Sequence, residues 1–100
     1  MNKYLLKLFI TGRQSPRSLL TLTNLHRICE EELGTGCKLT IIDVLEQPQL
    51  AEKGKILVTP TLIKEFPLPV RRIIGDLSDK EQVLRGLELP HHESIEGANK

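Results

Sequence analysis

The stretch KILVTPTLIKEFPLPVRRIIGDLSD, residues 55–79, decides how the second half of this chain folds. Apolar pieces at residues 56–58, 62–63 and 70–74 are separated by Pro60 and by the pair Pro67 and Pro69. Proline fixes φ and has no amide hydrogen, so it is confined to strand starts, edges and turns. The pattern favours two short strands separated by a proline-rich bend, each buried on at least one face, with a turn at residues 75–76.

Length and composition indicate one small domain. The chain has 100 residues, of which 39% are hydrophobic and 27% charged, and its formal net charge is +1. This balance gives no global field to attract nucleic acid or a membrane surface. No apolar run is long enough to cross a bilayer, and the N-terminus lacks the features of a signal peptide, so we expect a cytoplasmic protein. The domain is expected to span residues 1–90, followed by a flexible polar tail at residues 91–100.

The first half of the chain has the pattern of a β-α-β unit. Residues 3–10 are apolar on both faces, as in a central strand covered by helices. Ser15 and Pro16 start a helix as N-cap and first helical residue, and Gly34 follows its end. The acids at residues 30–32 oppose the helix dipole, and we interpret them as a solvated face in preference to a partner surface. Residues 38–44 predict a second buried strand parallel to the first.

The second half adds a short helix, the two proline-separated strands and a last helix. Residues 48–53 are compatible with a helix, and Ser78 with Glu81 forms a capping box before the final one. The order β-α-β-α-β-β-α is that of an α/β, thioredoxin-like domain, in which Pro60 occupies the place of a typically cis proline. Residues 12–15, where thioredoxins carry their reactive thiols, contain no cysteine, so we expect no oxidoreductase activity.

The sequence contains few motifs of catalytic or ligand-binding sites. No phosphate-cradling glycine pattern and no set of metal ligands at the usual spacing is present, so no cofactor and no metal are expected. Cys29 falls on the apolar face of the first helix and does not form a C-x-x-C pair with Cys37, so a structural role is expected for it. The cations Lys55, Arg71 and Arg72 are the one cluster of interest. They are either exposed strand-end charges or a partner surface.

One local conflict concerns the last helix. Gly86 lies inside the helical pattern, where glycine costs ~1 kcal/mol relative to alanine, and residues 87–89 then alternate as a strand does. The three upstream prolines add slow cis/trans choices to the same half. Two packings separated by a few kcal/mol would explain these mixed signals. A frayed last turn is the simpler alternative.

The segments IIDVLEQPQLAEKGKILVTPTL and PLPVRRIIGDLSD carry a resemblance to the KaiB family, which extends over residues 4–89. The resemblance implies a non-enzymatic regulator that binds the first ATPase ring domain of a KaiC-like protein. It also implies a fold-switching C-terminal half, with a homodimeric or homotetrameric ground state of order βαββααβ expected in crystals. In the thioredoxin-like state, family members displace a histidine kinase and sequester KaiA.

The resemblance also implies roles for individual residues. Lys55, Arg71 and Arg72 match family cations that line a charged cleft or touch partners. Glu88, close to Gly86 in the sequence, replaces a family aspartate and is also expected to contribute to partner binding. Gly86 matches a glycine whose replacement favours the binding fold, and Pro60, Pro67 and Pro69 lie in the segment that switches.

Departures from the family pattern leave the biological process open. Leu5 stands where tyrosine is common, and the tail HHESIEGANK replaces an acidic one. These differences suggest a divergent paralogue or a member from outside the core clock, and relatives of that kind pair with a KaiC-like ATPase in stress adaptation without driving a daily rhythm. The alternative from a different class is a thioredoxin-like sensor or adaptor that binds another protein without switching fold.

Overall fold

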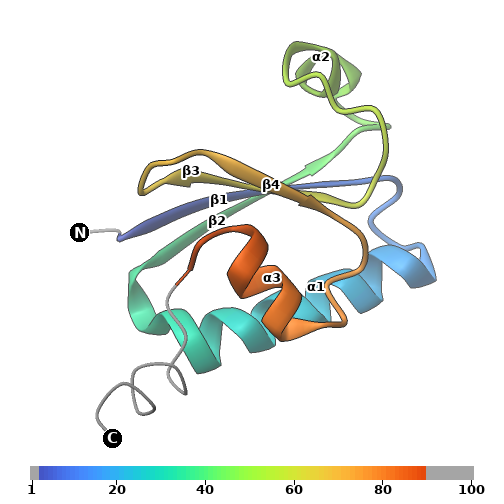
Figure 1. The fold of residues 1–100 in the computed structure, drawn as a ribbon. Coiled ribbons are helices and arrows are strands. Elements are labelled where there is room, and N and C mark those ends of the chain that lie inside the picture. The colour runs from blue at the N-terminus through green and yellow to red at the C-terminus, as the bar shows by residue number, and fades with distance from the viewer. Residues whose placement is uncertain (1–2, 90–100) are drawn as a thin grey trace, which may run out of the picture.

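A computed structural model describes residues 3–89, which form one four-stranded sheet with helices on both sides (Figure 1). The strand order is β2-β1-β3-β4. The strands are β1 (Tyr4–Ile10), β2 (Cys37–Asp43), β3 (Thr61–Phe66) and β4 (Arg71–Ile74). β1 pairs parallel with β2 and antiparallel with β3, and β3 pairs antiparallel with β4.

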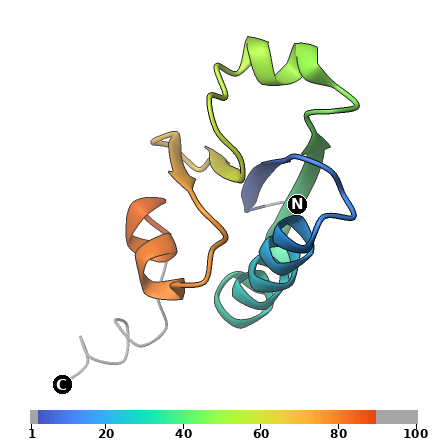
Figure 2. The same cartoon turned by 90° about the vertical axis from the view of Figure 1, so that its right-hand side faces the viewer.

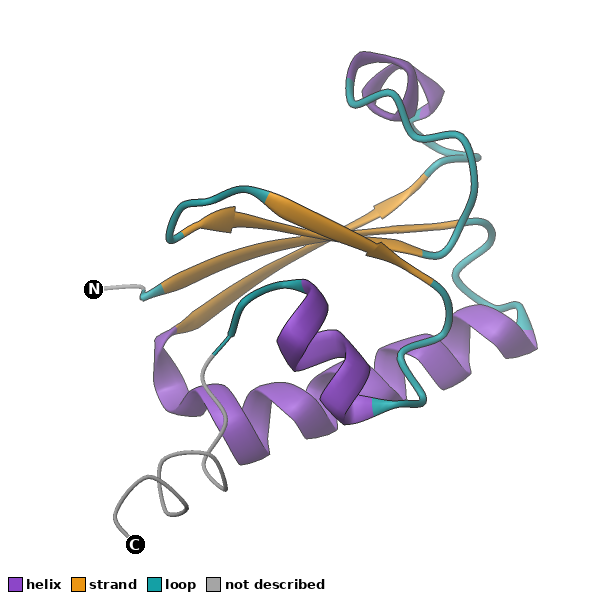
Figure 3. Cartoon of the chain, viewed as in Figure 1, coloured by secondary structure: helices purple, strands orange, loops and turns teal. Residues whose placement is uncertain are grey.

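The helices are placed unequally about this sheet. They are α1 (Pro16–Ile28), α2 (Pro48–Lys53) and α3 (Lys80–Gly86). A π-helical turn, η1 (Cys29–Leu33), and a 3₁₀ turn, η2 (Gly34–Gly36), connect α1 to β2. Figures 1 and 3 show α1 and α3 side by side on one face, with α2 beyond the other face. The turned view in Figure 2 confirms the separation.

The element order confirms the thioredoxin-like arrangement expected from the sequence. Ser15 is the N-cap of α1, and its Oγ accepts a hydrogen bond from the Ser18 amide at 3.2 Å. The C-terminal half runs α-β-β-α, so this structure has the fold expected for partner binding. The order βαββααβ stays a prediction for crystals.

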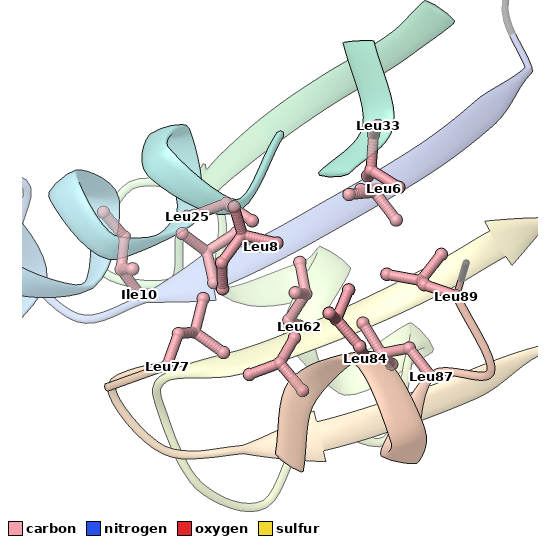
Figure 4. Close-up of a cluster of buried hydrophobic side chains, with 12 residues drawn as sticks. Leu6, Leu8, Ile10, Leu25, Leu33, Leu62, Leu77, Leu84, Leu87 and Leu89 are labelled. Atoms are coloured by element: carbon pink, nitrogen blue, oxygen red, sulfur yellow. The ribbon is translucent and has the colours of Figure 1, made fainter. Parts of the chain in front are cut away.

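The main core lies between the sheet and the pair α1 and α3. Figure 4 shows leucines from β1, α1, β3 and α3 meeting there. The buried members include Leu6, Leu8, Leu25, Leu62, Val83, Leu84 and Leu87. A smaller cluster of Phe9, Ile42 and Ile63 lies on the opposite face, against Leu50 and Ile56. Because successive strand residues point to opposite faces, β1 supplies both clusters.

Three local expectations were wrong. Residues 56–58 form no strand, and Leu57 is 96% exposed. The N-cap of α3 is Asp79, whose side chain accepts from the Gln82 amide, because the Asp76 carboxylate already holds the Ser78 amide in the preceding turn. Third, the acids at residues 30–32 do not form a fully solvated face. Glu32 is only 7% exposed, and its carboxylate lies 2.8 Å from the Lys80 ammonium.

Three peptide bonds that precede prolines in the second half are cis: Thr59–Pro60, Phe66–Pro67 and Leu68–Pro69.

Among residues 3–89, no helix has the length and apolar character needed to span a bilayer. The expected tail at residues 91–100 lies outside the described residues.

Asp43, at the end of β2, holds the loop that leads from β1 into α1. Its carboxylate accepts hydrogen bonds from the amides of Gly12, Arg13 and Leu45, each at 3.0 Å, and only 3% of the residue is exposed. These amide donors, with that of Gly12 foremost, hold the pKa of Asp43 below its ordinary value. One ionised side chain therefore fixes the loop between β1 and α1 against the end of β2.

We predict that Asp43→Asn lowers the melting temperature at neutral pH and flattens its fall in acid. A carboxylate whose pKa is lowered in the folded state stabilises the fold at pH values above its pKa in the unfolded chain. That contribution is lost as the pH falls below about 4. Thermal melts from neutral to acidic pH check this. Glu52→Gln, on the exposed side of α2, is the control and should keep the parent profile. Equal acid sensitivity in Asp43→Asn and the parent would contradict the assignment.

Candidate partner-binding surface

Exposed aliphatic side chains gather where the α2–β3 connection meets β4. Leu57 is 96% exposed, Val58 44%, Val70 51% and Ile74 59%. Arg72 and Ile74 alternate with their neighbours along β4 and therefore lie on one face, the face away from α3, and Val70 precedes the strand at the same spacing. We call Leu57, Val58, Val70, Arg72 and Ile74 the α2–β4 surface. Exposed apolar groups gathered in this way are typical of protein interaction sites.

Arg72 ties the two parts of this surface together. Its guanidinium donates to the carbonyls of Gly54 at 3.1 Å and Lys55 at 3.3 Å, at the C-terminal end of α2. The carbonyls at the end of a helix carry partial negative charge, so a cation is favourable there. β4 is thereby anchored to the segment that presents Leu57.

A groove with a volume of about 410 Å³ lies beside the α2–β4 surface, on the sheet face opposite α3. Phe9, Ile63 and Val70 contribute to its apolar lining, and Lys53 and Arg72 contribute positive charge. Lys7 and Glu65 also line it, but they neutralise each other through an ion pair of 2.9 Å. The net charge of the groove is therefore positive, which suits an acidic group on a partner.

Arg71 does not belong to this surface, although it is adjacent to Arg72 in the sequence. Its guanidinium pairs with the Glu88 carboxylate, just after α3, at 2.8 Å, and both side chains are about half exposed (49% and 48%). Strand alternation places the two arginines on opposite faces of the sheet. Arg72 therefore contacts the backbone carbonyl of Lys55, whereas Arg71 forms an ion pair with Glu88. The three cations do not come together as one cluster.

Lys55 and Glu88 share an unusual backbone position. Their φ angles are +56° and +55°, and each directly follows the C-cap of a helix. In both places the next amide donates to the carbonyl five residues back, Ile56 to Ala51 and Leu89 to Leu84, each at 2.8 Å. This is the Schellman motif, in which glycine normally takes the left-handed position. A residue with a Cβ costs roughly 1–2 kcal/mol there.

The residues expected to control a fold switch lie around α3 and β3. A Cβ added at Gly86 would lie 3.2 Å from Cδ1 of Ile73 in β4, so α3 packs closely on that strand. Pro60 is buried at the entry to β3, and Pro67 and Pro69 form the connection from β3 to β4. Their role in switching stays a prediction.

The loop that carries thiols in thioredoxins is an ordinary polar turn here. Ser15 Oγ donates to the Thr11 carbonyl at 3.2 Å, and the Thr11 and Thr59 hydroxyl oxygens are 2.6 Å apart. These contacts bring the loop next to the residue before Pro60. The loop thus supports the fold and offers no nucleophilic thiol.

Sequence reasoning missed the aliphatic part of the α2–β4 surface. Leu57 and Val58 lie in an apolar run and Val70 and Ile74 in a strand, and both patterns predict burial. These side chains are exposed because no described helix or strand covers them, either on the α2–β3 connection or on the face of β4 away from α3. The exposed cation Arg72 was the one available signal.

Comparison with known proteins gives a family match over most of the chain. The model of the KaiB domain family matches residues 7–89. The chain is 56% identical to circadian clock protein KaiB3 of Synechocystis sp., over 89% of this chain and 86% of the relative. It is also 56% identical to the circadian clock oscillator protein KaiB of Synechococcus elongatus, over 90% and 87%.

Solved structures show the same fold. The N-terminal domain of Synechococcus elongatus SasA superimposes with a TM-score of 0.70 at 30% identity, over 88% of this chain and 86% of that one. Yeast mitochondrial thioredoxin 3 superimposes with a TM-score of 0.67 at 17% identity, over 88% and 79%, which indicates a shared fold alone.

The class is therefore a thioredoxin-like α/β domain that acts as a regulator and not as an enzyme. The chain belongs to the KaiB family. Its curated relatives are circadian clock proteins, which supports a circadian regulator.

We predict that Lys55→Gly stabilises this fold by ~0.5–1 kcal/mol, because glycine relieves the left-handed strain at some cost in unfolded-state entropy. The Lys55 side chain makes no ion pair with a described residue, so little else is lost. Chemical denaturation measures the change.

The matched control is Glu52→Gly, inside α2, which should destabilise the fold by up to ~1 kcal/mol. A loss of stability in both variants would contradict the strain assigned to Lys55.

Proposed function

We propose that this protein is a regulator that binds a KaiC-like ATPase ring through the α2–β4 surface. The process is circadian timing or, for a divergent member, stress adaptation. KaiA or a histidine kinase competes for the same site. The observation that carries the proposal is the exposed aliphatic surface around Arg72, in a chain 56% identical to clock proteins.

Fold switching in the C-terminal half is the second part of the proposal. Within the described residues, the non-glycine positions with positive φ are Lys55, Leu77 and Glu88, and all three follow Asp43. Strain of this kind persists only where the surrounding packing imposes it. This strain raises the free energy of the thioredoxin-like fold relative to a homodimeric or homotetrameric ground state. Association with the ring is then slow, because only a small fraction of the chains is competent.

A thioredoxin-like adaptor that keeps one fold is the second candidate. The observation that favours it is the similarity to the SasA N-terminal domain, at 30% identity and a TM-score of 0.70, in the arrangement described here. Such an adaptor would associate with its partner without a slow phase.

We predict that Leu57→Glu weakens binding to a purified KaiC-like hexamer by about 30-fold or more, because a charge replaces an exposed apolar contact. Fluorescence anisotropy with labelled full-length chain measures the affinity. The matched control is Leu20→Glu: Leu20 is 47% exposed and lies on α1, on the other side of the sheet, so binding should be unchanged. Parent-like binding by Leu57→Glu would reject the α2–β4 surface as the contact.

We also predict that Gly86→Ala speeds association by up to about fivefold. Alanine gains helix propensity of ~1 kcal/mol in α3, which raises the fraction of competent chains. The new methyl group meets Ile73 Cδ1, and Ile73→Val removes that carbon. Adding Ile73→Val to Gly86→Ala therefore separates propensity from crowding. Stopped-flow and manual-mixing traces give the rates. Rapid association of the parent, left unchanged by every variant, would favour the adaptor over the switching regulator.

A further inference from the structure

Two cysteine side chains meet at the end of α1 farthest from the loop of residues 11–15. Cys29 begins η1 and Cys37 begins β2, and their sulfur atoms lie 3.4 Å apart. The helix between the loop and Cys29 has 13 residues, which corresponds to about 20 Å. The pair is therefore distinct from the position of the reactive thiols in thioredoxins.

Both thiols can be reached from solvent. Cys29 and Cys37 are partly exposed free cysteines, and they line a surface hollow of about 390 Å³ together with His26, Glu30 and Thr35. A hollow of this size is within the range of small-molecule sites. The described residues gather no group of three potential metal ligands there or elsewhere. The chemistry available to the pair is therefore that of two neighbouring thiols.

The contact between the sulfur atoms makes the two thiols unequal. Either sulfur atom can donate the hydrogen bond that joins the two thiols. This hydrogen bond lowers the pKa of Cys37, although partial burial of Cys37 opposes the shift. The same hydrogen bond raises the pKa of Cys29, as do burial and the nearby Cys37 and Glu30 charges. Because the thiolate is the nucleophile in disulfide exchange, Cys37 reacts first and Cys29 acts as the resolving thiol.

We propose that Cys29 and Cys37 form a reversible dithiol site that a small disulfide of the glutathione type oxidises to an intramolecular disulfide. The Cys37 thiolate attacks one sulfur of the oxidant, forms a mixed disulfide and releases one thiolate. Cys29 then loses its proton and attacks Cys37 Sγ, which releases the second thiolate. Two electrons pass from the protein to the oxidant, and the protons end on the two released thiols.

The local structure permits this closure and links it to α3. The sulfur atoms must approach by about 1.4 Å, and the intervening segment is an irregular turn with Gly34 at φ +66°. That segment also carries Glu31 and Glu32, whose carboxylates lie 3.4 and 2.8 Å from the Lys80 ammonium at the start of α3. A disulfide would hold the turn, and with it the ion pairs that position α3.

The test incubates the reduced full-length chain in glutathione buffers of increasing oxidised fraction and follows intact mass and free thiols. The parent should lose two hydrogen atoms in mass, retain no free thiol and melt ~10 °C higher, and a reductant should reverse all three changes. No change in mass, two stable glutathione adducts, or disulfide-linked dimers would each overturn the proposal.

Single variants test the assigned order of the thiols. Cys29→Ser should stop at one glutathione on Cys37, whereas Cys37→Ser should react at least about tenfold more slowly. If serine disturbs the core contact, Cys29→Ala tests the arrest at one glutathione but not the rate, because alanine also removes the hydrogen bond to Cys37. Circular dichroism verifies the folding of each variant. Equal reaction rates of the two single variants would overturn the assignment of Cys37 as the nucleophile.

Discussion

The burial of β1 on both faces is the constraint on which the rest of this structure depends. β1 pairs with β2 on one side and β3 on the other, so it provides the hydrogen-bonding template for both halves of the sheet. Leu6 and Leu8 enter the core beneath α1 and α3, whereas Phe9 enters the cluster beside α2. Nearly complete burial of these side chains contributes roughly 1.5–3 kcal/mol each. The position of every other element follows from contact with this strand or with its neighbours.

The two halves of the domain are held in different ways. In the first half, Ser15 caps α1 and Asp43 receives three backbone amides, so local sequence and tertiary contacts agree. In the second half, Lys55, Leu77 and Glu88 take left-handed conformations, and the side chain of Lys64 in β3 is removed from water. Withdrawing a lysine nitrogen from water also costs free energy. Where local sequence preferences and tertiary contacts agree, the sequence specifies one structure. Where they conflict, the energy gap between this structure and alternative folds is smaller.

The same division separates the two chemical features of the surface. The strained half presents Leu57 and Arg72, exposed in this fold and suited to a macromolecular partner. The unstrained half presents the Cys29 and Cys37 thiols, in a hollow suited to a small molecule. Glu31 and Glu32 join these regions through Lys80, because η1 follows α1 directly while Lys80 begins α3. A change at the thiols therefore has a short physical route to the half that carries the α2–β4 surface.

By itself, the sequence determined the element order, the start of α1, the parallel first pair of strands and the places where prolines divide the second half. These follow from hydrophobic period, capping and backbone restriction, which act over a few residues. Only the tertiary structure decided that Leu57 is exposed, that Arg71 and Arg72 serve opposite faces, that Asp79 and not Ser78 caps α3, and that two cysteines eight residues apart touch. The physical reason is that each of these depends on which distant groups arrive nearby, and a local pattern carries no information about those groups.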